Sequence, residues 1–209
     1  MVESPEPPET AERTETESEI MAATYRALCE HGYASLTMQA IADEYGKTTA
    51  AIHYHYDTKE GLMVAFLEYL LDRFVEHVEE VETVEPAARL HDLAGQFLRD
   101  DPEYRDLVVA VIELRAQAPY DADLREQFKQ NNEYIRALLR TVVEDGIEQG
   151  VFRDVDPEHV ATACLTIVDG ARARYVTLDE PDAIDDGRQT LEEYLESVVH
   201  VGRSDERTE

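Results

Sequence analysis

The chain has 209 residues and a formal net charge of −28, because 47 Asp and Glu residues outnumber 19 Lys and Arg. The acidic amino-terminal stretch lacks the pattern of a secretory signal, and no apolar run approaches the roughly 18 residues of a transmembrane helix. We therefore expect a cytoplasmic protein without a membrane partner. The two cysteines, Cys29 and Cys164, lie in apolar runs, which predict buried thiols rather than a disulfide framework.

The basic residues are unusual in kind. Only three of them, Lys47, Lys59 and Lys129, are lysines, and the other sixteen are Arg. An acidic surface that is poor in Lys is typical of proteins from salt-in halophiles, in which dense carboxylates keep the surface hydrated. Near molar salt the Debye length falls to about 3 Å, so these carboxylates repel one another little. The composition favours a halophilic, archaeal source over an ordinary acidic protein.

The first part of the chain predicts a tail followed by a helix. Residues 1–16 contain three prolines and many Glu, but no large apolar side chain after Val2. Such a composition cannot bury enough surface to offset the entropy of ordering, which predicts a disordered acidic tail. A helix is expected over about 16–31, and its inward-facing residues are expected to be Ile20, Ala23, Ala27 and Leu28.

Residues 37–60 predict two short helices joined by a tight turn, with a further helix starting directly after them. Thr37 stands where an N-cap is needed, and Gly46 follows the first helix at a position suited to a left-handed backbone. The second helix, over about 48–55, carries small polar residues and two His. Asp57 with Glu60 predicts a capping box for the next helix. Two short helices joined in this way fit the major groove of DNA.

This region resembles the TetR (tetracycline-repressor-like) family of transcriptional regulators in the order and spacing of its residues. The match covers about residues 17–64 and rests on Gly32-Tyr33, Thr37, Ile41-Ala42, Gly46, Ile52 to Tyr56 and Thr58 to Leu62. The chain departs from the family at His53, where Tyr is common, and at Thr49-Ala50, where Lys-Gly is frequent. Target sequence and phosphate contacts therefore cannot be copied from relatives.

The resemblance places one face of the second helix against DNA, with residues at neighbouring helix starts flanking the groove. Thr hydroxyls and an Ala methyl can contact base edges, and Tyr or His can donate to phosphate; capping or packing is the alternative role. The DNA-binding candidates are Thr37, Lys47, Thr48, Thr49, Ala50, His53, Tyr54, His55 and Lys59. Because molar salt removes most of the counterion-release contribution, we hypothesise that His53 or His55 is protonated against phosphate.

The distribution of acidic residues agrees with this assignment, although the net charge is wrong at first sight for a nucleic-acid binder. Residues 20–64 carry five acids and three bases, a net charge of −2, so the other 164 residues carry −26. The two longest runs without an acid are 31–42 and 45–56, which include the whole second helix. Acidic side chains are thus kept off the surface that would meet phosphate.

Proline and Asp residues mark the starts of further helices beyond the head. We expect helices over about 58–81, 86–98, 102–117, 121–149, 156–177 and 185–201. No stretch alternates like a strand, so the predicted fold class is all-α, with about nine helices. The expected domains are a helix-turn-helix DNA-binding head at 17–64, a helical ligand-binding and dimerisation body at 65–202, and a disordered tail at 203–209.

The resemblance also implies that the body binds a small inducer between its helices and pairs its last two helices with those of a second copy. Apolar stripes with a few polar points suit such a cavity, with a solid core as the alternative for each residue. The pocket candidates are Tyr104, Val108, Ile112, Arg115, Tyr134, Leu138, Cys164 and Asp169. The dimer candidates are Val160, Ala163, Ile167, Ala171, Leu191, Tyr194, Leu195 and Val198.

Enzyme signatures are missing from the sequence, which has no Gly-rich phosphate loop and no nucleophile elbow. His53 and His55 are two residues apart and face apart on a helix, so we expect no metal and no other cofactor. The sequence predicts a homodimeric repressor on a palindromic double-stranded DNA operator, released by an unidentified small-molecule effector. The alternatives are a regulator without ligand control, a regulator that activates rather than represses, and a helical protein-interaction module that has lost DNA binding.

Overall fold

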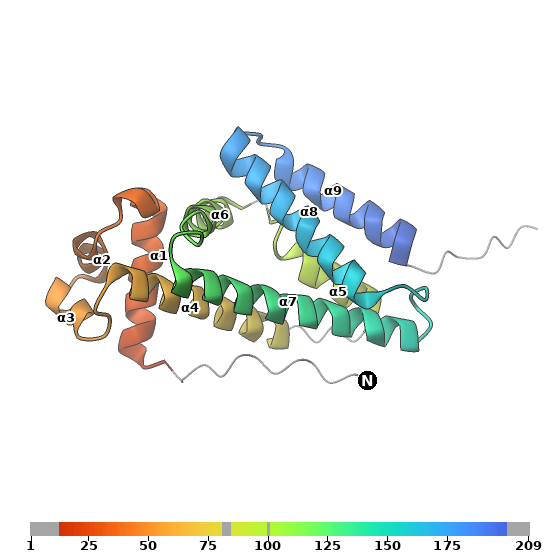
Figure 1. Cartoon of the computed structure of the whole chain (residues 1–209), viewed down its shortest axis with the longest axis horizontal. Coiled ribbons are helices and arrows are strands. Elements are labelled where there is room, and N and C mark those ends of the chain that lie inside the picture. Colours follow the sequence, from red (N-terminus) through yellow and green to blue (C-terminus); the bar gives the residue numbers. More distant parts are fainter. Residues whose placement is uncertain (1–12, 81–84, 100, 200–209) are drawn as a thin grey trace, which may run out of the picture. The chain divides into compact units, whose positions relative to one another are not determined.

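The computed structural model describes residues 13–80, 85–99 and 101–199 (Figure 1). Within these ranges the chain forms nine α-helices and one short π-helical turn, and it contains no β-strand. The predicted all-α fold class is confirmed. The tails predicted at 1–12 and 203–209 lie outside the described residues.

The described chain forms two compact units. The first contains residues 13–80 and 101–133, and the second contains residues 85–99 and 134–199. Helix α7 (Ala122–Glu148) contributes to both. The predicted boundary at residue 64, between a DNA-binding head and a ligand-binding body, stays a prediction.

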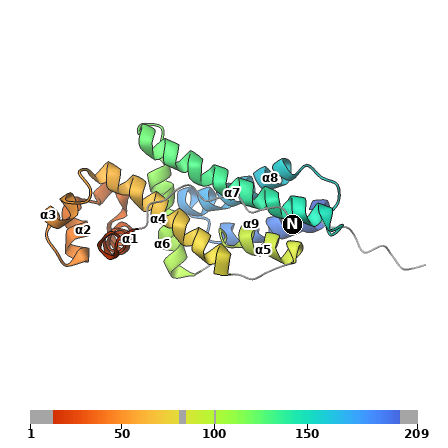
Figure 2. The same ribbon diagram turned by 90° about the horizontal axis from the view of Figure 1, so that it is seen from below.

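The first unit contains the long helix α4 (Lys59–Glu80), and the two short helices α2 (Met38–Tyr45) and α3 (Thr49–His53) lie beside the start of α4 in both views (Figures 1 and 2). Besides α7, the other members are α1 (Glu15–Ser35) and α6 (Pro102–Arg115). The four residues predicted to face inward from α1 are all buried, as are Ile41, Ile52 and Phe66 from the helices around it. One apolar core therefore holds α2 and α3 against α1 and α4.

Helix α1 begins earlier than the sequence predicted. Thr14 is its N-cap: the Thr14 hydroxyl accepts the N–H of Glu17 at 3.3 Å, and the Glu17 carboxylate accepts the N–H of Thr14 at 2.8 Å. This capping box satisfies two free backbone groups of the first turn. The disordered tail predicted to run to residue 16 is therefore wrong for residues 13–16.

The carboxyl end of α1 contains a kink at Gly32, whose φ of 67° lies in the left-handed region. A Cβ atom there would lie 3.1 Å from the Glu113 carboxylate of α6. The same carboxylate accepts the backbone N–H of Tyr33. Close approach and positive φ together explain why the Gly-aromatic pair of the sequence begins with glycine.

The second unit consists of α5 (Pro86–Gly95), the second half of α7, α8 (Pro157–Leu178), α9 (Ala183–Tyr194) and a π-helical turn (Leu195–Val199). Two Arg side chains close the carboxyl end of α5: Arg172 of α8 donates to the Phe97 carbonyl, and Arg188 of α9 donates to the Leu98 carbonyl. The predicted helix bounds hold to within a few residues, except that the last helix ends in the π-helical turn.

Helices α8 and α9 lie side by side and approach closely (Figure 2). A Cβ atom added at Gly187 of α9 would lie 2.4 Å from the Ala171 Cβ of α8, so this contact has room only for glycine. Four of the eight dimer candidates, Val160, Ala171, Leu191 and Leu195, are buried within the chain. The dimer interface stays a prediction.

Candidate nucleic-acid interface

The turn between α2 and α3 has the geometry that its sequence predicts. The Thr37 hydroxyl accepts the N–H of Ala40 at 3.1 Å and so caps α2. Gly46 has a φ of 71°, and the N–H of Lys47 donates back to the Ala42 carbonyl at 3.2 Å. These bonds satisfy the last carbonyls of α2 and fix the angle at which the chain enters α3.

Helix α3 is only five residues long, and a helix of this length does not persist in water by itself. Its stability comes from Ile52, which is fully buried among α1, α2 and α4. Burial of one Ile side chain contributes about 1.5–3 kcal/mol, which anchors the helix by one face. The opposite face is left to solvent.

The solvent face of α3 and the turn after it hold most of the DNA-binding candidates. Thr48, Ala50 and His53 are exposed, and the side chain of Tyr54 is 87% exposed. Thr49 is half-buried. The exposed Tyr54 ring lies beside Thr48, Ala50 and His53, so these side chains are together accessible to another molecule.

His55 faces away from His53, as their spacing predicts. Its imidazole is half-buried, with Nδ1 lying 3.8 Å from the Glu17 Oε1 of α1. The Tyr54 ring meets it edge-on at a centroid distance of 5.2 Å, and Tyr56 follows at 6.3 Å. His55 is therefore held by α1 rather than projecting freely.

Two acidic side chains of α2, Asp43 and Glu44, are hydrogen-bonded within the first unit. Glu44 of α2 accepts from Arg26 Nε at 2.9 Å, and Asp43 accepts from the Gln39 side chain at 2.7 Å. Lys47 is exposed beside them, where its ammonium donates to the Tyr45 hydroxyl at 3.0 Å. That bond, with the nearby Glu19 carboxylate, raises the pKa of Lys47, so it remains a cation.

Lys59 has a different position from Lys47. Its Nζ donates to the carbonyls of Tyr33 at 3.3 Å and Leu36 at 3.1 Å, and it lies 4.2 Å from the centroid of the Tyr33 ring. The ammonium thus closes the carboxyl end of α1, where a positive charge is favoured. Contact with phosphate stays a prediction for Lys59, whereas its bonds to the backbone are a structural role that the sequence did not indicate.

The start of α4 corrects one further expectation. The Thr58 hydroxyl accepts the N–H of Gly61 at 3.0 Å, so Thr58 is the cap of this helix. The capping box predicted from Asp57 and Glu60 is wrong by one residue, because the helix begins at Lys59. Asp57 and Thr58 both carry a side-chain oxygen that can accept a backbone N–H at an N-cap, and the sequence alone did not separate them.

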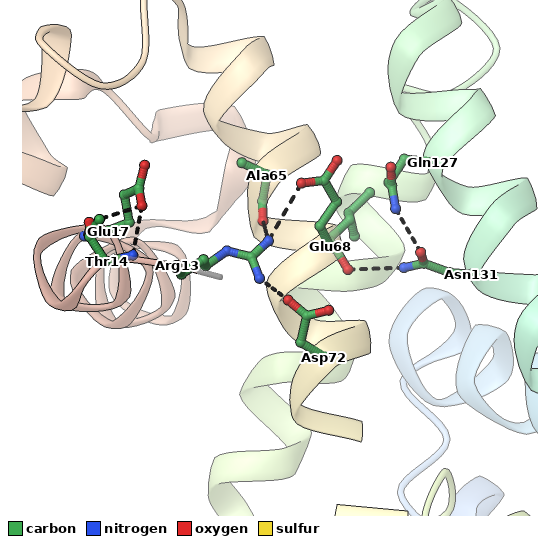
Figure 3. Close-up of polar contacts among 9 residues, drawn as sticks. Arg13, Thr14, Glu17, Ala65, Glu68, Asp72, Gln127 and Asn131 are labelled. Carbon is green, nitrogen blue, oxygen red and sulfur yellow. Dashed lines mark hydrogen bonds and ion pairs between the residues drawn. The ribbon is translucent and has the colours of Figure 1, made fainter. Parts of the chain in front are cut away.

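A polar network that the sequence analysis missed ties α1 and α7 to α4 (Figure 3). The Arg13 guanidinium donates to Asp72, to Glu68 at 3.5 Å and to the Ala65 carbonyl at 3.3 Å. On the other side of α4, Asn131 of α7 donates to the Leu67 carbonyl at 3.0 Å and accepts from Gln127 at 2.9 Å. The Thr-x-x-Glu pattern at 14–17 could have indicated order here, but no local pattern points to Arg13.

The eight pocket candidates divide equally between the two units. In the first, Tyr104 and Val108 are buried, Ile112 is partly buried, and Arg115 is exposed beside the Phe128 ring. In the second, Tyr134, Leu138 and Cys164 are buried and Asp169 is partly buried. The pocket stays a prediction.

Of the remaining dimer candidates, Ala163, Ile167 and Tyr194 are partly buried, and the Val198 side chain lies outside the described part.

Family models match both parts of the chain. One described as "Bacterial regulatory proteins, tetR family" matches residues 20–66, and one described as "BetI-type transcriptional repressor, C-terminal" matches residues 86–200. The described ranges contain no helix long and apolar enough to cross a membrane.

Individual proteins similar to the chain are transcriptional regulators. The HTH-type transcriptional repressor AcnR of Corynebacterium glutamicum is 27% identical over 165 residues, which cover 78% of this chain and 84% of AcnR. The HTH-type transcriptional regulator TtgR of Pseudomonas putida is 26% identical over 193 residues, which cover 83% of this chain and 85% of TtgR.

Solved structures show the same fold. A TetR transcription regulator from Haloarcula marismortui is 53% identical, with a TM-score of 0.83 over 88% of this chain and 98% of that one. A regulator from Saccharomonospora viridis, solved in complex with choline, is 23% identical, with a TM-score of 0.78 over 90% of this chain and 100% of that one. The second likeness is one of fold alone.

Proposed function

Because the chain belongs to the TetR family and is a DNA-binding transcriptional repressor, we propose that it binds a palindromic operator as a homodimer and is released by a small-molecule inducer. The observation that carries the proposal is the solvent face of α3, where Tyr54 is 87% exposed beside Thr48, Ala50 and His53. These side chains contact base edges and phosphates, while Lys47 supplies positive charge at the turn.

The dimer forms, in this proposal, through the outer face of α8. From residue 159 on, the exposed residues of α8 include no acid, although the chain has 47; they are His159, Thr162, Thr166, Gly170, Arg174, Thr177 and Leu178. The exposed face of α9 instead carries Asp185, Asp186, Glu192 and Glu193, which would repel a second copy. A two-fold contact brings each residue near its own mate, so a face without acids suits it.

An organic cation is the first class of effector to screen. The regulator from Saccharomonospora viridis was solved in complex with choline, and its chain shares this fold. A cation is also attracted by a net charge of −28. For release to follow, the effector must bind the DNA-free conformation more tightly than the DNA-bound one.

A halophilic archaeal source fits both the composition and the likeness to the Haloarcula marismortui regulator at 53% identity. At molar salt the counterion-release contribution to DNA affinity is small. Hydrogen bonds and packing at α3 then carry most of the affinity, which agrees with a recognition face that contains Thr, His and Tyr rather than Lys and Arg.

The test is a selection of genomic fragments by the purified full-length protein at low and at molar KCl. We expect enrichment of a palindrome whose half-sites lie about 10 base pairs apart, retained at molar KCl. Recovery of unrelated fragments at every salt concentration would contradict the proposal and favour a protein-interaction module.

Choline and related quaternary ammonium compounds are then added to the retained complex, and an absence of release with every compound would favour a regulator without this ligand control.

A further inference from the structure

The carboxylate of Glu17 lies between the start of α1 and the turn after α3. Its Oε2 accepts the N–H and the hydroxyl of Thr14, at 2.8 and 2.9 Å, while its Oε1 lies 3.8 Å from the Nδ1 of His55. One oxygen atom is thus used for helix capping, and the other is directed at an imidazole among the DNA-binding candidates.

We propose that Glu17 is a positioning residue for DNA recognition, which holds His55 by Nδ1 and so presents Nε2 to a DNA phosphate as a proton donor. The proposal rests on the DNA-binding role given above to α3 and the turn after it. It adds that operator binding takes up a proton from solvent at His55 of each subunit.

The chemistry follows from the two nitrogen atoms of the imidazole. A neutral ring carries one N–H; if that N–H faces Glu17, then Nε2 has a lone pair that repels a phosphate oxygen. The imidazolium carries an N–H on both nitrogen atoms, so Nδ1–H can face the Glu17 carboxylate 3.8 Å away while Nε2–H donates to the phosphate. Only the imidazolium can therefore interact favourably with the carboxylate and the phosphate at the same time.

The surroundings of the pair keep Glu17 ionised. The pKa of Glu17 is lowered chiefly by the backbone N–H of Thr14 and then by the Thr14 hydroxyl, with smaller contributions from His55 and Arg13. Arg13 is itself paired with Glu68 and Asp72 of α4, which fastens the start of α1. The carboxylate is therefore available to His55 at any pH near neutral.

The other titratable groups near His55 do not supply the same effect. Tyr54 and Tyr56 lie on its own segment, and burial raises the pKa of Tyr56, which stays neutral. From α4, Glu68 acts on this region and is paired with Arg13. His53 is exposed on the other side of α3 and is the internal control.

The experiment measures operator affinity of the full-length protein between about pH 8 and pH 6 at fixed KCl, the range in which an imidazole titrates. For the wild type we expect affinity to rise as pH falls. Glu17→Gln keeps the capping box, because Gln serves at this position as well as Glu, but it removes the charge that faces His55. At the low end of the range it should bind about two- to fivefold more weakly than the matched control Glu15→Gln, and equally at the high end.

Two histidine variants complete the test. His55→Gln should abolish the pH dependence, and His53→Gln should keep it. A wild-type affinity that does not change with pH would overturn the inference while leaving the repressor function intact, and so would loss of the pH dependence in His53→Gln alone. Failure of the wild type to bind the operator at any pH would instead contradict the proposed function itself.

Discussion

Replacement of Lys59 by Met separates a structural lysine from a DNA-contacting one. Lys59→Met keeps the apolar stem but removes the donor that bonds to the carbonyls of Tyr33 at 3.3 Å and Leu36 at 3.1 Å. Hydrogen bonds from a charged donor contribute about 1.5–3 kcal/mol each when buried. Because the ammonium is only partly buried, we expect a total loss of about 2 kcal/mol, which lowers Tm by roughly 4–8 °C in a chain of this size.

The assay is thermal unfolding by circular dichroism at fixed KCl, with Lys47→Met as the matched charge control. Lys47 is exposed and is bonded only to side chains in the structure, so its replacement should leave Tm nearly unchanged and weaken DNA binding. Equal Tm values for the two variants would refute the structural role assigned to Lys59. A loss of DNA affinity in Lys59→Met without any loss of stability would restore its predicted contact with phosphate.

Three further predictions concern packing, the thiols and the dimer. Gly187→Ala should destabilise the protein by about 1–3 kcal/mol in urea unfolding, because its Cβ would lie 2.4 Å from a neighbouring Cβ, whereas Gly95→Ala meets nothing within 4 Å and should not. Burial raises the pKa of Cys164 to about 12, so in native protein at pH 8 this thiol should resist alkylation; reaction as fast as in denaturant would contradict its burial. Because the pKa of Cys164 is higher in the folded than in the unfolded chain, its contribution to the free energy of unfolding is fully present below about pH 9. That contribution is lost as the pH rises from about 9 toward 12. If the proposed dimer forms through the outer face of α8, Gly170→Arg at its open position should give a folded monomer in sedimentation, while Gln189→Arg on α9 should not. Equal dimerisation of both variants would rule out the α8 face.

Local signals in the sequence were sufficient for the helix-turn-helix. A threonine before an apolar run and a glycine after it determine the cap and the turn through atoms only a few residues apart, as Thr37 and Gly46 do. The helical periodicity of α1 likewise predicted its buried residues, because one face of a helix must meet the core.

Contacts between residues far apart in the sequence could not be predicted from local patterns. Lys59 bonds to carbonyls 23 and 26 residues earlier in the chain, and Glu113 accepts an N–H from a residue 80 positions away. No pattern in the sequence distinguishes such residues from solvated charges, particularly among 47 acids. The sequence does not place the dimer interface for a related reason: an apolar stripe predicts burial, but not whether the covering helix belongs to the same chain or to a second copy.

The central claim is that the solvent face of α3 and the turn after it contact the operator, and two tyrosines of equal exposure test it most directly. Tyr54 is 87% exposed at the end of α3, and Tyr120 is 89% exposed before α7. The measurement is fluorescence anisotropy of a labelled operator fragment at molar KCl with Tyr54→Ala and Tyr120→Ala. We expect Tyr54→Ala to lose about tenfold or more in affinity, as for a contact of roughly 1.4 kcal/mol or above, and Tyr120→Ala to bind like the wild type. Equal affinity of both variants would contradict the claim.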